Sequence, residues 1–289
     1  MLRAIFASLR VQQWVKNFFL FAPLIFAKHL AFQNESINVA IGFILFSLVA
    51  SGVYILNDVA DSEQDKLHPE KQNRPIPSGK ISKHSAILIS ASLIFVSILL
   101  SFAFHDDFAI LVILYTAINI LYSLKLKHVV ILDVMIIATG FVLRVFAGAV
   151  IIKVPVSEWL LICTFLLSLF LGFIKRRNEI LVLETKAEYH RKVLEQYSVT
   201  FLDQMVNIVT ACTVISYALY TISEETIQKF HTRTLIFTVP FVLFGIFRYL
   251  YLIHNKNIGG NPTKIVLTDI PLIINIALWM SSVLYIIYA

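Results

Sequence analysis

Nine long apolar runs constrain the fold of this 289-residue chain more than any other feature. A helix needs about 20 apolar residues to cross a hydrocarbon core of about 30 Å. The runs lie at residues 16–32, 37–56, 84–104, 108–124, 129–152, 157–174, 200–221, 233–253 and 267–288. They are too continuous for the alternating pattern of a membrane β-barrel. The sequence therefore predicts an all-α, polytopic bundle of about nine transmembrane helices.

Composition supports this fold class. Hydrophobic residues make up 58% of the chain and charged residues 15%, whereas about 25% are charged in soluble domains. The start, MLRAIFASLRVQQWVKN, is basic and amphipathic and has no small-residue cleavage site, so we do not expect a cleaved signal peptide. No long linker or low-complexity tract divides the chain. We expect one integral-membrane domain over residues 1–289.

The distribution of Lys and Arg predicts the orientation of the bundle. Of the 24 Lys and Arg, 19 fall in the N-terminal segment and in loops 57–83, 125–128, 175–199 and 248–266. By the positive-inside rule these segments are cytoplasmic, and nine crossings place the C-terminus outside. The net charge of +6 then follows from topology. A nucleic-acid partner is not expected, because no soluble basic surface with exposed aromatic side chains is indicated.

A charged segment, NDVADSEQDKLHPEKQNRPIPSGK at 57–80, directly follows the second apolar run. Asp58, Asp61 and Asp65 recur at i, i+3 and i+7, and on a helix they cover about 60° of its circumference. Three like charges in one stripe favour a bound cation. Mg²⁺ fits, because it takes one or two carboxylates and completes its shell with water and substrate phosphate. Asn57 adds an amide beside the stripe. The alternative is a solvated loop whose charges only keep it in water.

Basic residues follow the acidic stripe within the same segment. Lys71, Arg74 and Lys80 have the charge that anion binding requires. Three prolines and a glycine among them predict the end of the helix and a fixed loop. Carboxylates for a metal beside bases for phosphate predict a diphosphate site. The positive-inside rule alone would also place bases at this membrane face. Each base, taken individually, could therefore serve topology rather than bind an anion.

The stretch NDVADSEQD has the form NDxxDxxxD and resembles the first aspartate-rich motif of the UbiA superfamily of intramembrane prenyltransferases. The resemblance implies a helical bundle, usually of nine spans, with a cytoplasm-facing cavity. Ordinary members join a prenyl diphosphate to an aromatic acceptor and carry a second aspartate-rich motif after the sixth span. That place here reads LGFIKRRNEILVLE, with Lys175, Arg176 and Glu179 but no DxxxD. Cations in place of carboxylates favour a substrate richer in phosphate.

Further segments are similar to the decaprenyl-phosphate phosphoribosyltransferase branch of that superfamily. They are QQWVKN at 12–17, YSLKLKHVVILDVMIIATGFVLRVFAGA at 122–149, KRRNE at 175–179 and FRYLYLIHNKNIGGNPTKIVLTD at 247–269. The resemblance implies transfer of a 5-phosphoribosyl group from 5-phosphoribosyl 1-diphosphate to a polyprenyl phosphate, with Mg²⁺ as cofactor. It also implies the inner (plasma) membrane of a bacterium, and it allows a homo-oligomer such as a trimer.

The implied reaction suggests a role for each candidate residue. A phosphate monoester is already anionic near neutral pH, so it needs no strong general base, whereas the departing pyrophosphate needs a metal and fixed cations. We expect Asp58, Asp61 and Asp65 to act through magnesium. Tyr122 would orient the ribose. The remaining candidates for substrate binding are Lys16 for the lipid phosphate, and Asn57, Lys71, Arg74, Lys125, Lys127, Lys175, Arg176 and Glu179 around the donor.

Arg144 stands about 15 residues into the fifth run, where an ionisable group usually faces a cavity or a partner. Asp133 precedes it by three helical turns, so both could line one face. The sequence does not decide between two roles of Arg144. One is a structural contact with Asp133 or with a carbonyl group, and the other is contact with substrate. The small residues Ala147, Gly148 and Ala149 predict close helix packing.

Two other functions stay open at this stage. The first is prenyl transfer from a prenyl diphosphate to an aromatic or other acceptor, against which the absent second DxxxD argues. The second is a transporter whose charged cytoplasmic rim forms a gate. A carrier buries ionisable residues near the middle of the membrane, whereas nearly all charges here are predicted at one face.

Overall fold

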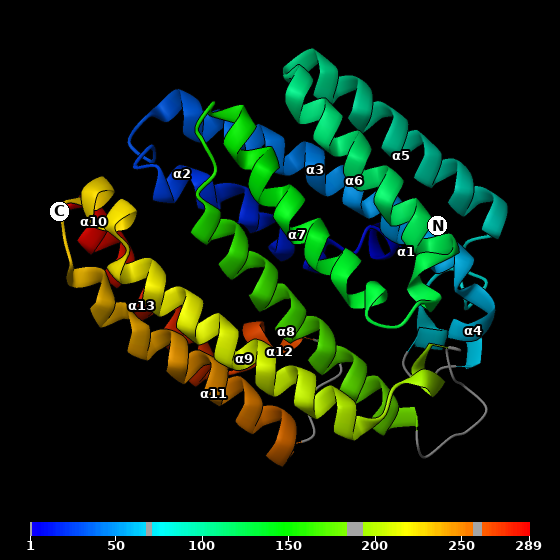
Figure 1. Ribbon diagram of the computed structural model, residues 1–289. Helices are drawn as coiled ribbons and strands as arrows, with labels where there is room; N and C mark the ends of the chain where they lie inside the picture. Colours follow the sequence, from blue (N-terminus) through cyan, green and yellow to red (C-terminus); the bar gives the residue numbers. More distant parts are fainter. Residues whose placement is uncertain (1, 68–70, 184–192, 257–261) are drawn as a thin grey trace. The chain divides into compact units, whose positions relative to one another are not determined.

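The computed structural model describes residues 2–67, 71–183, 193–256 and 262–289, and throughout these ranges the regular structure is helical (Figure 1). Eight stretches are long and apolar enough to cross a membrane. They coincide with or overlap α3 (Gln33–Ala60), α5 (Lys83–Phe104), α6 (Asp106–Leu124), α7 (Leu132–Ile151), α8 (Glu158–Leu183), α9 (Val199–Ile222), α11 (Val239–Lys256) and α13 (Ile270–Tyr288). The predicted all-α polytopic class is confirmed, and the chain is an integral membrane protein.

Shorter helices precede and connect the long ones. They are α1 (Leu2–Ser8), η1 (Val11–Phe21), α2 (Ala22–Phe26), α4 (Ser62–Leu67), η2 (Lys71–Asn73), η3 (Leu126–His128), η5 (Leu194–Gln196), α10 (Glu224–Phe230), η6 (Thr234–Thr238) and α12 (Pro262–Thr268). The first predicted run, 16–32, is therefore not one continuous helix. Pro23 stands in the first turn of α2 and lacks the backbone donor that a continuing helix needs.

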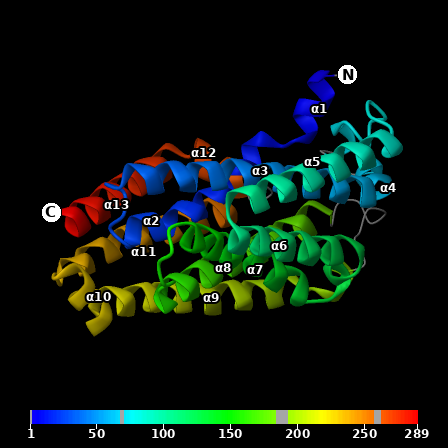
Figure 2. The same cartoon turned by 90° about the horizontal axis from the view of Figure 1, so that it is seen from above.

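The chain divides into two compact units, Met1–Val156 with Lys186–Gln196, and Ser157–Thr185 with Tyr197–Ala289. In the first unit α3 contacts α5, α6, α7 and η1, and α6 also contacts α5 and α7. In the second unit α8 packs against α9, and α11 packs against α9 and α13. Within the first unit α1 and α4 lie at the same end of α3 (Figure 2). The acidic segment therefore shares that end with the chain's N-terminal helix.

The core of the first unit forms around α3 and α7, the most buried of the eight candidate spans. Phe46, Phe108 and Tyr115 belong to one buried apolar cluster there. Gly148 allows η1 to approach α7 closely, because a Cβ at this position would lie 1.9 Å from the carbonyl oxygen of Leu20. The close packing predicted from the small residues at 147–149 is thus present in the structure.

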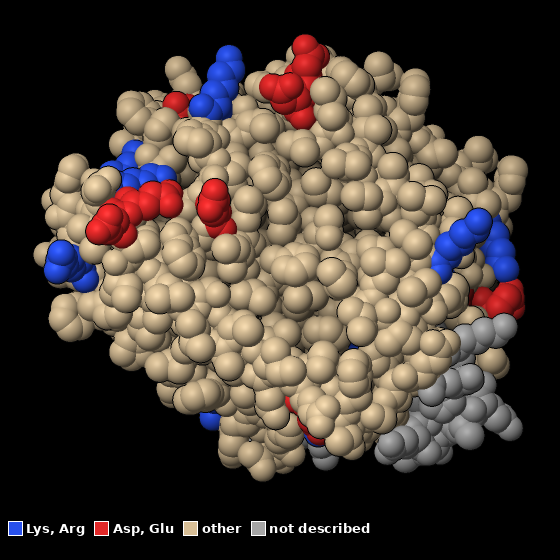
Figure 3. Space-filling model, in the orientation of Figure 1, with Lys and Arg blue, Asp and Glu red and all other residues tan. Residues whose placement is uncertain are grey.

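The outer faces of the helices are apolar. On α5, for example, Phe95, Leu99 and Phe102 are exposed. In the face shown in Figure 3, the surface is mostly uncharged, and the Lys, Arg, Asp and Glu side chains occupy small separate areas of it. Exposed apolar helix faces with their backbone groups bonded internally are what contact with lipid requires.

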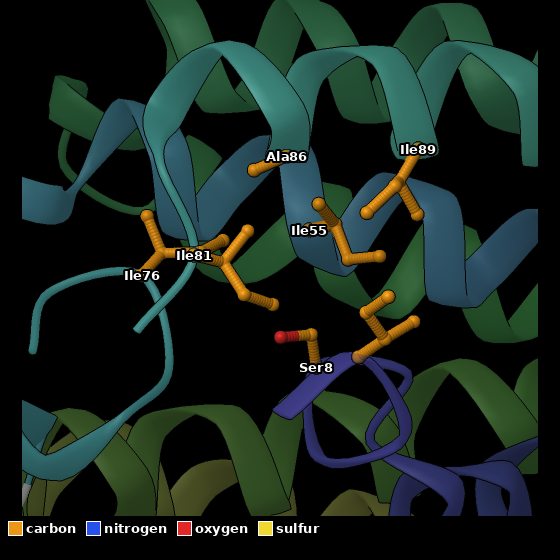
Figure 4. A pocket seen from close by; sticks show the side chains of 7 residues that line it. Ser8, Ile55, Ile76, Ile81, Ala86 and Ile89 are labelled. Carbon is orange, nitrogen blue, oxygen red and sulfur yellow. The ribbon is translucent and has the colours of Figure 1, made fainter. Parts of the chain in front are cut away.

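An apolar contact fixes the proline-rich loop that follows η2. Ile76 and Ile81 of this loop pack against Ile55 of α3 and Ala86 of α5 (Figure 4). The loop closes with a hydrogen bond from the Ile81 N–H to the Pro75 carbonyl, 3.1 Å long, and it passes through Gly79 at φ 76°, in the region that favours glycine. The predicted fixed loop is confirmed for residues 75–81, whereas Pro69 lies outside the described residues. The loop holds the preceding basic residue, Arg74, beside the end of α3.

Candidate functional site

The three aspartates of the acidic stripe lie where α3 passes into α4. The Asp61 N–H donates to the Asn57 carbonyl over 2.9 Å, and the Asp65 N–H donates to the Asp61 carbonyl over 2.8 Å. The helical path thus continues across the boundary and keeps the three side chains on one face. Asp58 and Asp61 are 2% exposed and Asp65 is 3% exposed. A solvated loop is therefore the wrong description for these carboxylates, and buried carboxylates need partners.

Arg74 bridges two of the aspartates. Its NH1 nitrogen lies 3.1 Å from Asp58 Oδ1 and 2.6 Å from Asp65 Oδ2. Arg10 also donates to Asp58 Oδ1 through NH2. Two guanidinium groups from separate loops thus neutralise the first and last carboxylates of the stripe. Bonds between ionised partners are the strongest hydrogen bonds that proteins make.

The middle aspartate has its own set of partners. Lys127 Nζ donates to Asp61 Oδ1 over 2.5 Å, and Asn57 Nδ2 donates to Asp61 Oδ2 over 3.2 Å. Ser123 at the end of α6 donates to Asn57 Oδ1 over 3.2 Å. This chain of contacts ties the acidic stripe to the turn between α6 and α7. Three buried acids are thereby matched by the three bases Arg10, Arg74 and Lys127.

The donor chemistry of the stripe fits a magnesium ion held jointly with substrate. Oxygens of Asp58 and Asp65 already face one cation, the Arg74 guanidinium. Among the described residues there is no group of three or more His, Cys, Asp and Glu side chains that could hold a metal ion alone. Magnesium commonly takes only one or two carboxylates and fills its shell with water and phosphate oxygens. The arrangement matches that pattern rather than a cage made only of protein ligands.

A second polar cluster surrounds Arg144 inside the first unit. Its Nε donates to Asn17 Oδ1 over 2.7 Å, its NH1 to the Gly140 carbonyl over 2.6 Å and its NH2 to the Tyr115 hydroxyl over 3.1 Å. The guanidinium also lies over the rings of Phe46, Tyr115 and Phe141. Of the two structural contacts considered above, the structure shows the carbonyl one. Arg144 therefore fixes η1 against α7.

Lys16 neighbours this cluster on η1. Its Nζ lies 5.9 Å from the ring centroid of Tyr54, and no ion pair is found for it within the described part of the chain. Asn17, the next residue, is held by Ser47 of α3 and by Arg144. The Lys16 side chain thus has no acidic partner among the described residues, while its backbone is anchored.

The other predicted residues of the first unit differ in how far they are exposed. Lys71 begins η2 and is half-buried, as is Tyr122 in the last turn of α6. Lys125 is exposed and forms the C-cap of α6. Whether these three side chains contact a substrate stays a prediction.

The remaining candidates, Lys175, Arg176 and Glu179, lie on α8 of the second unit. Arg176 is fully buried and its NH1 lies 2.5 Å from Glu179 Oε2. The adjacent Arg177 donates to Asp203 of α9 over 2.5 Å. Arg176 and Arg177 are thus each paired with an acid of their own unit, and the role of Lys175, Arg176 and Glu179 toward a donor stays a prediction.

Arg10 is the residue of this site that the sequence did not reveal. It stands at φ 51° in the turn between α1 and η1, a conformation that costs a non-glycine residue about 1–2 kcal/mol. Burial lowers the pKa of its guanidinium, and the Asp58 carboxylate opposes that shift. The only sequence feature that pointed to Arg10 is the basic, amphipathic character of the N-terminal segment. The positive-inside rule explains that feature equally well.

Comparison with known proteins identifies the family of the chain. The model of the UbiA prenyltransferase family matches residues 18–266. The decaprenyl-phosphate phosphoribosyltransferases of Mycolicibacterium smegmatis and Corynebacterium glutamicum are 30% and 34% identical, over 96% and 97% of this chain and 90% and 86% of their own lengths. The solved structure of a UbiA homologue from Archaeoglobus fulgidus, bound to GPP and Mg²⁺, has a TM-score of 0.74 at 19% identity and covers 99% of this chain and 100% of its own. The chain belongs to the UbiA prenyltransferase family.

Proposed function

We propose that this protein is a membrane phosphoribosyltransferase that moves the 5-phosphoribosyl group of 5-phosphoribosyl 1-diphosphate to a polyprenyl phosphate. A phosphate oxygen of the lipid forms a bond to C1 of the ribose, the bond from C1 to the diphosphate oxygen breaks, and pyrophosphate leaves with the electron pair. The names of the relatives that cover nearly all of this chain support this reaction.

The observation that carries the proposal is that every motif aspartate contacts at least one base, with Arg74 shared between Asp58 and Asp65. Arg10 and Arg74 contact Asp58, and Lys127 contacts Asp61. A donor diphosphate brings negative charge, and magnesium brings positive charge. When both enter, the aspartates can exchange their bases for the metal, and the freed bases can bind phosphate oxygens. Each side chain then keeps an opposite charge beside it, which a buried ionised group requires.

The chain's own residues divide the work of the reaction. Asp58, Asp61 and Asp65 hold the cation, while Arg74 and Lys127 stay beside the diphosphate and stabilise the charge that develops on it as it leaves. Magnesium, when bound, neutralises diphosphate oxygens. Lys16 binds the lipid phosphate, which would supply the anionic partner that its side chain lacks among the described residues. Asn57, Lys71 and Lys125 contact the donor's phosphates, and Tyr122 orients the ribose.

We further propose that this end of α3 faces the cytoplasm. The basic loops of the chain predict that orientation, and a soluble, phosphate-rich donor reaches the site from that side. The polyprenyl chain would lie along apolar helix faces in the bilayer, of the kind that α5 exposes.

A transfer assay tests the proposal. Purified protein in detergent, Mg²⁺, decaprenyl phosphate and ribose-labelled 5-phosphoribosyl 1-diphosphate should yield label in the organic extract and one pyrophosphate for each ribose transferred. Asp58→Asn should abolish the transfer. The matched control is Asp107→Asn, which alters an exposed aspartate in the first turn of α6 and should leave the rate unchanged.

Two further arms separate the alternatives. A labelled prenyl diphosphate replaces the sugar donor in the first, and transfer from it to an aromatic acceptor would contradict the proposed donor. Protein in liposomes loaded with labelled donor forms the second, and flux across the bilayer without any new lipid product would indicate a carrier instead.

A further inference from the structure

Ser62 carries a buried hydroxyl group with no partner. The side chain is 1% exposed, and within the described part of the chain its Oγ makes no hydrogen bond. A buried hydroxyl that gives up its water without gaining a partner costs free energy. Such groups are uncommon in native proteins, and each one calls for an explanation.

The position of Ser62 connects it with the acidic stripe. The helical hydrogen bonds from Asp61 to Asn57 and from Asp65 to Asp61 carry the helix across this point. At about 100° per residue, Ser62 lies about 40° from Asp58 and about 60° from Asp65 around the axis. Ser62 therefore lies at one edge of the face that presents the three carboxylates, about 100° from Asp61. An unpartnered buried hydroxyl at the edge of this face can donate to a ligand that binds there.

The chemistry of that face indicates which part of a ligand the hydroxyl suits. Ionised carboxylates only accept hydrogen bonds, whereas a serine hydroxyl can also donate one. Phosphate oxygens held beside aspartates through a metal gain from a neutral donor on the same surface. The charged donors at this site, Arg10, Arg74 and Lys127, come from other segments of the chain. Ser62 is the hydroxyl that the stripe itself supplies.

We propose that Ser62 is a further donor-binding residue, whose Oγ–H donates to a diphosphate oxygen of the magnesium-bound sugar donor. This inference rests on the proposed function and deepens it, since it adds a residue that recognises the leaving diphosphate. It also explains the orphaned hydroxyl, which is satisfied only in the complex.

Ser62→Ala tests the proposal through two quantities that should respond differently. Without ligand, the melting temperature of the detergent-solubilised variant should equal or exceed that of the wild type, because alanine removes an unsatisfied group. The dissociation constant for magnesium pyrophosphate, measured by calorimetry, should rise about tenfold, as expected for a lost hydrogen bond to a charged group. Ser62→Cys keeps the shape with a weak donor and should follow alanine.

Ser101→Ala is the matched control. Ser101 is also fully buried, on α5, but its Oγ already donates to the Ser97 carbonyl over 2.7 Å. This variant should have a lower melting temperature and an unchanged affinity for magnesium pyrophosphate. If Ser62 had a purely structural role, Ser62→Ala would likewise lower the melting temperature and leave the affinity for magnesium pyrophosphate unchanged.

The outcomes separate this inference from the proposed function. If the wild type bound neither magnesium pyrophosphate nor magnesium with 5-phosphoribosyl 1-diphosphate, the proposed function would fail, and the inference with it. If the wild type bound both and Ser62→Ala bound them within twofold as tightly, only the inference would be overturned. The inference would also be overturned if Ser62→Ala bound Mg²⁺ more weakly than the wild type when no phosphate compound is present, because the hydroxyl would then be a metal ligand.

Discussion

Lys127 Nζ lies 2.5 Å from Asp61 Oδ1, and neither side chain is more than 5% exposed. This contact joins the end of α3 to η3, 66 positions further along the chain. A buried ion pair adds little stability over apolar residues of the same size, but removal of one partner leaves a buried charge uncompensated. The pair is therefore a sensitive point of the site.

We expect Lys127→Met to destabilise the protein by about 3–5 kcal/mol, because it strands the Asp61 carboxylate. The double variant Asp61→Asn, Lys127→Met should recover most of that loss. Denaturant unfolding in mixed micelles, followed by fluorescence, measures both. Lys125→Met is the control, since Lys125 is exposed two positions earlier and should change stability little. Equal losses for the two lysines would contradict a special role of the buried pair.

The sequence predicted the spans and the acidic stripe because both depend on residues that are close together in the chain. Eight of the nine apolar runs coincide with candidate spans, since length and hydropathy determine which segments enter a bilayer. The stripe of Asp58, Asp61 and Asp65 forms as the helical period requires. Both predictions depend only on neighbours in the chain.

The pairing of acids with bases could not be read in the same way. Arg10 is 48 positions from Asp58 and Lys127 is 66 from Asp61, so only the packed helices decide which base meets which acid. Spacing likewise left Arg144 a choice between Asp133 and a carbonyl group. The structure shows the bond to Gly140, one helical turn earlier. The division of 16–32 between η1 and α2 was missed because hydropathy ignores what Pro23 does to the backbone.

Gly148→Ala should destabilise the protein by about 1–3 kcal/mol, as overpacking does. The new Cβ would meet the Leu20 carbonyl oxygen at 1.9 Å, and a backbone atom cannot turn away as a side chain can. Gly140→Ala on the same helix is the control, because its Cβ would meet nothing nearer than Arg144 NH1 at 3.4 Å. Melting temperatures of the two variants compare them, and equal values would contradict the close approach of η1 to α7.

Glu63 gives a pH dependence with a definite sign. Hydrogen bonds from Lys83 and Lys66 lower its pKa from 4.5 to about 2. A carboxylate with a depressed folded pKa stabilises the protein above the unfolded pKa, and the effect is lost as the pH falls through the folded one. The melting temperature of Glu63→Gln should therefore lie below that of the wild type by a constant amount above about pH 5. The difference should shrink between pH 4.5 and 2, and a difference independent of pH would contradict the ion pairs.

Arg74→Gln should change metal binding and turnover in opposite directions. The guanidinium occupies the point that Asp58 and Asp65 share, so its removal frees two carboxylates for magnesium. We expect the affinity for Mg²⁺ without donor to rise about tenfold, which corresponds to about 1.4 kcal/mol. The transfer rate should fall about a hundredfold, because one fixed cation beside the leaving diphosphate is lost.

Calorimetry with MgCl₂ and the lipid-extraction assay measure the two effects of Arg74→Gln. Lys80→Gln is the matched control, because Lys80 is an exposed base of the same loop and should alter neither quantity. If Arg74 served only to hold the loop, both metal affinity and turnover would fall together with the melting temperature. A rise in Mg²⁺ affinity with a loss of turnover is expected only if the arginine stands where the metal binds and then moves to the phosphates.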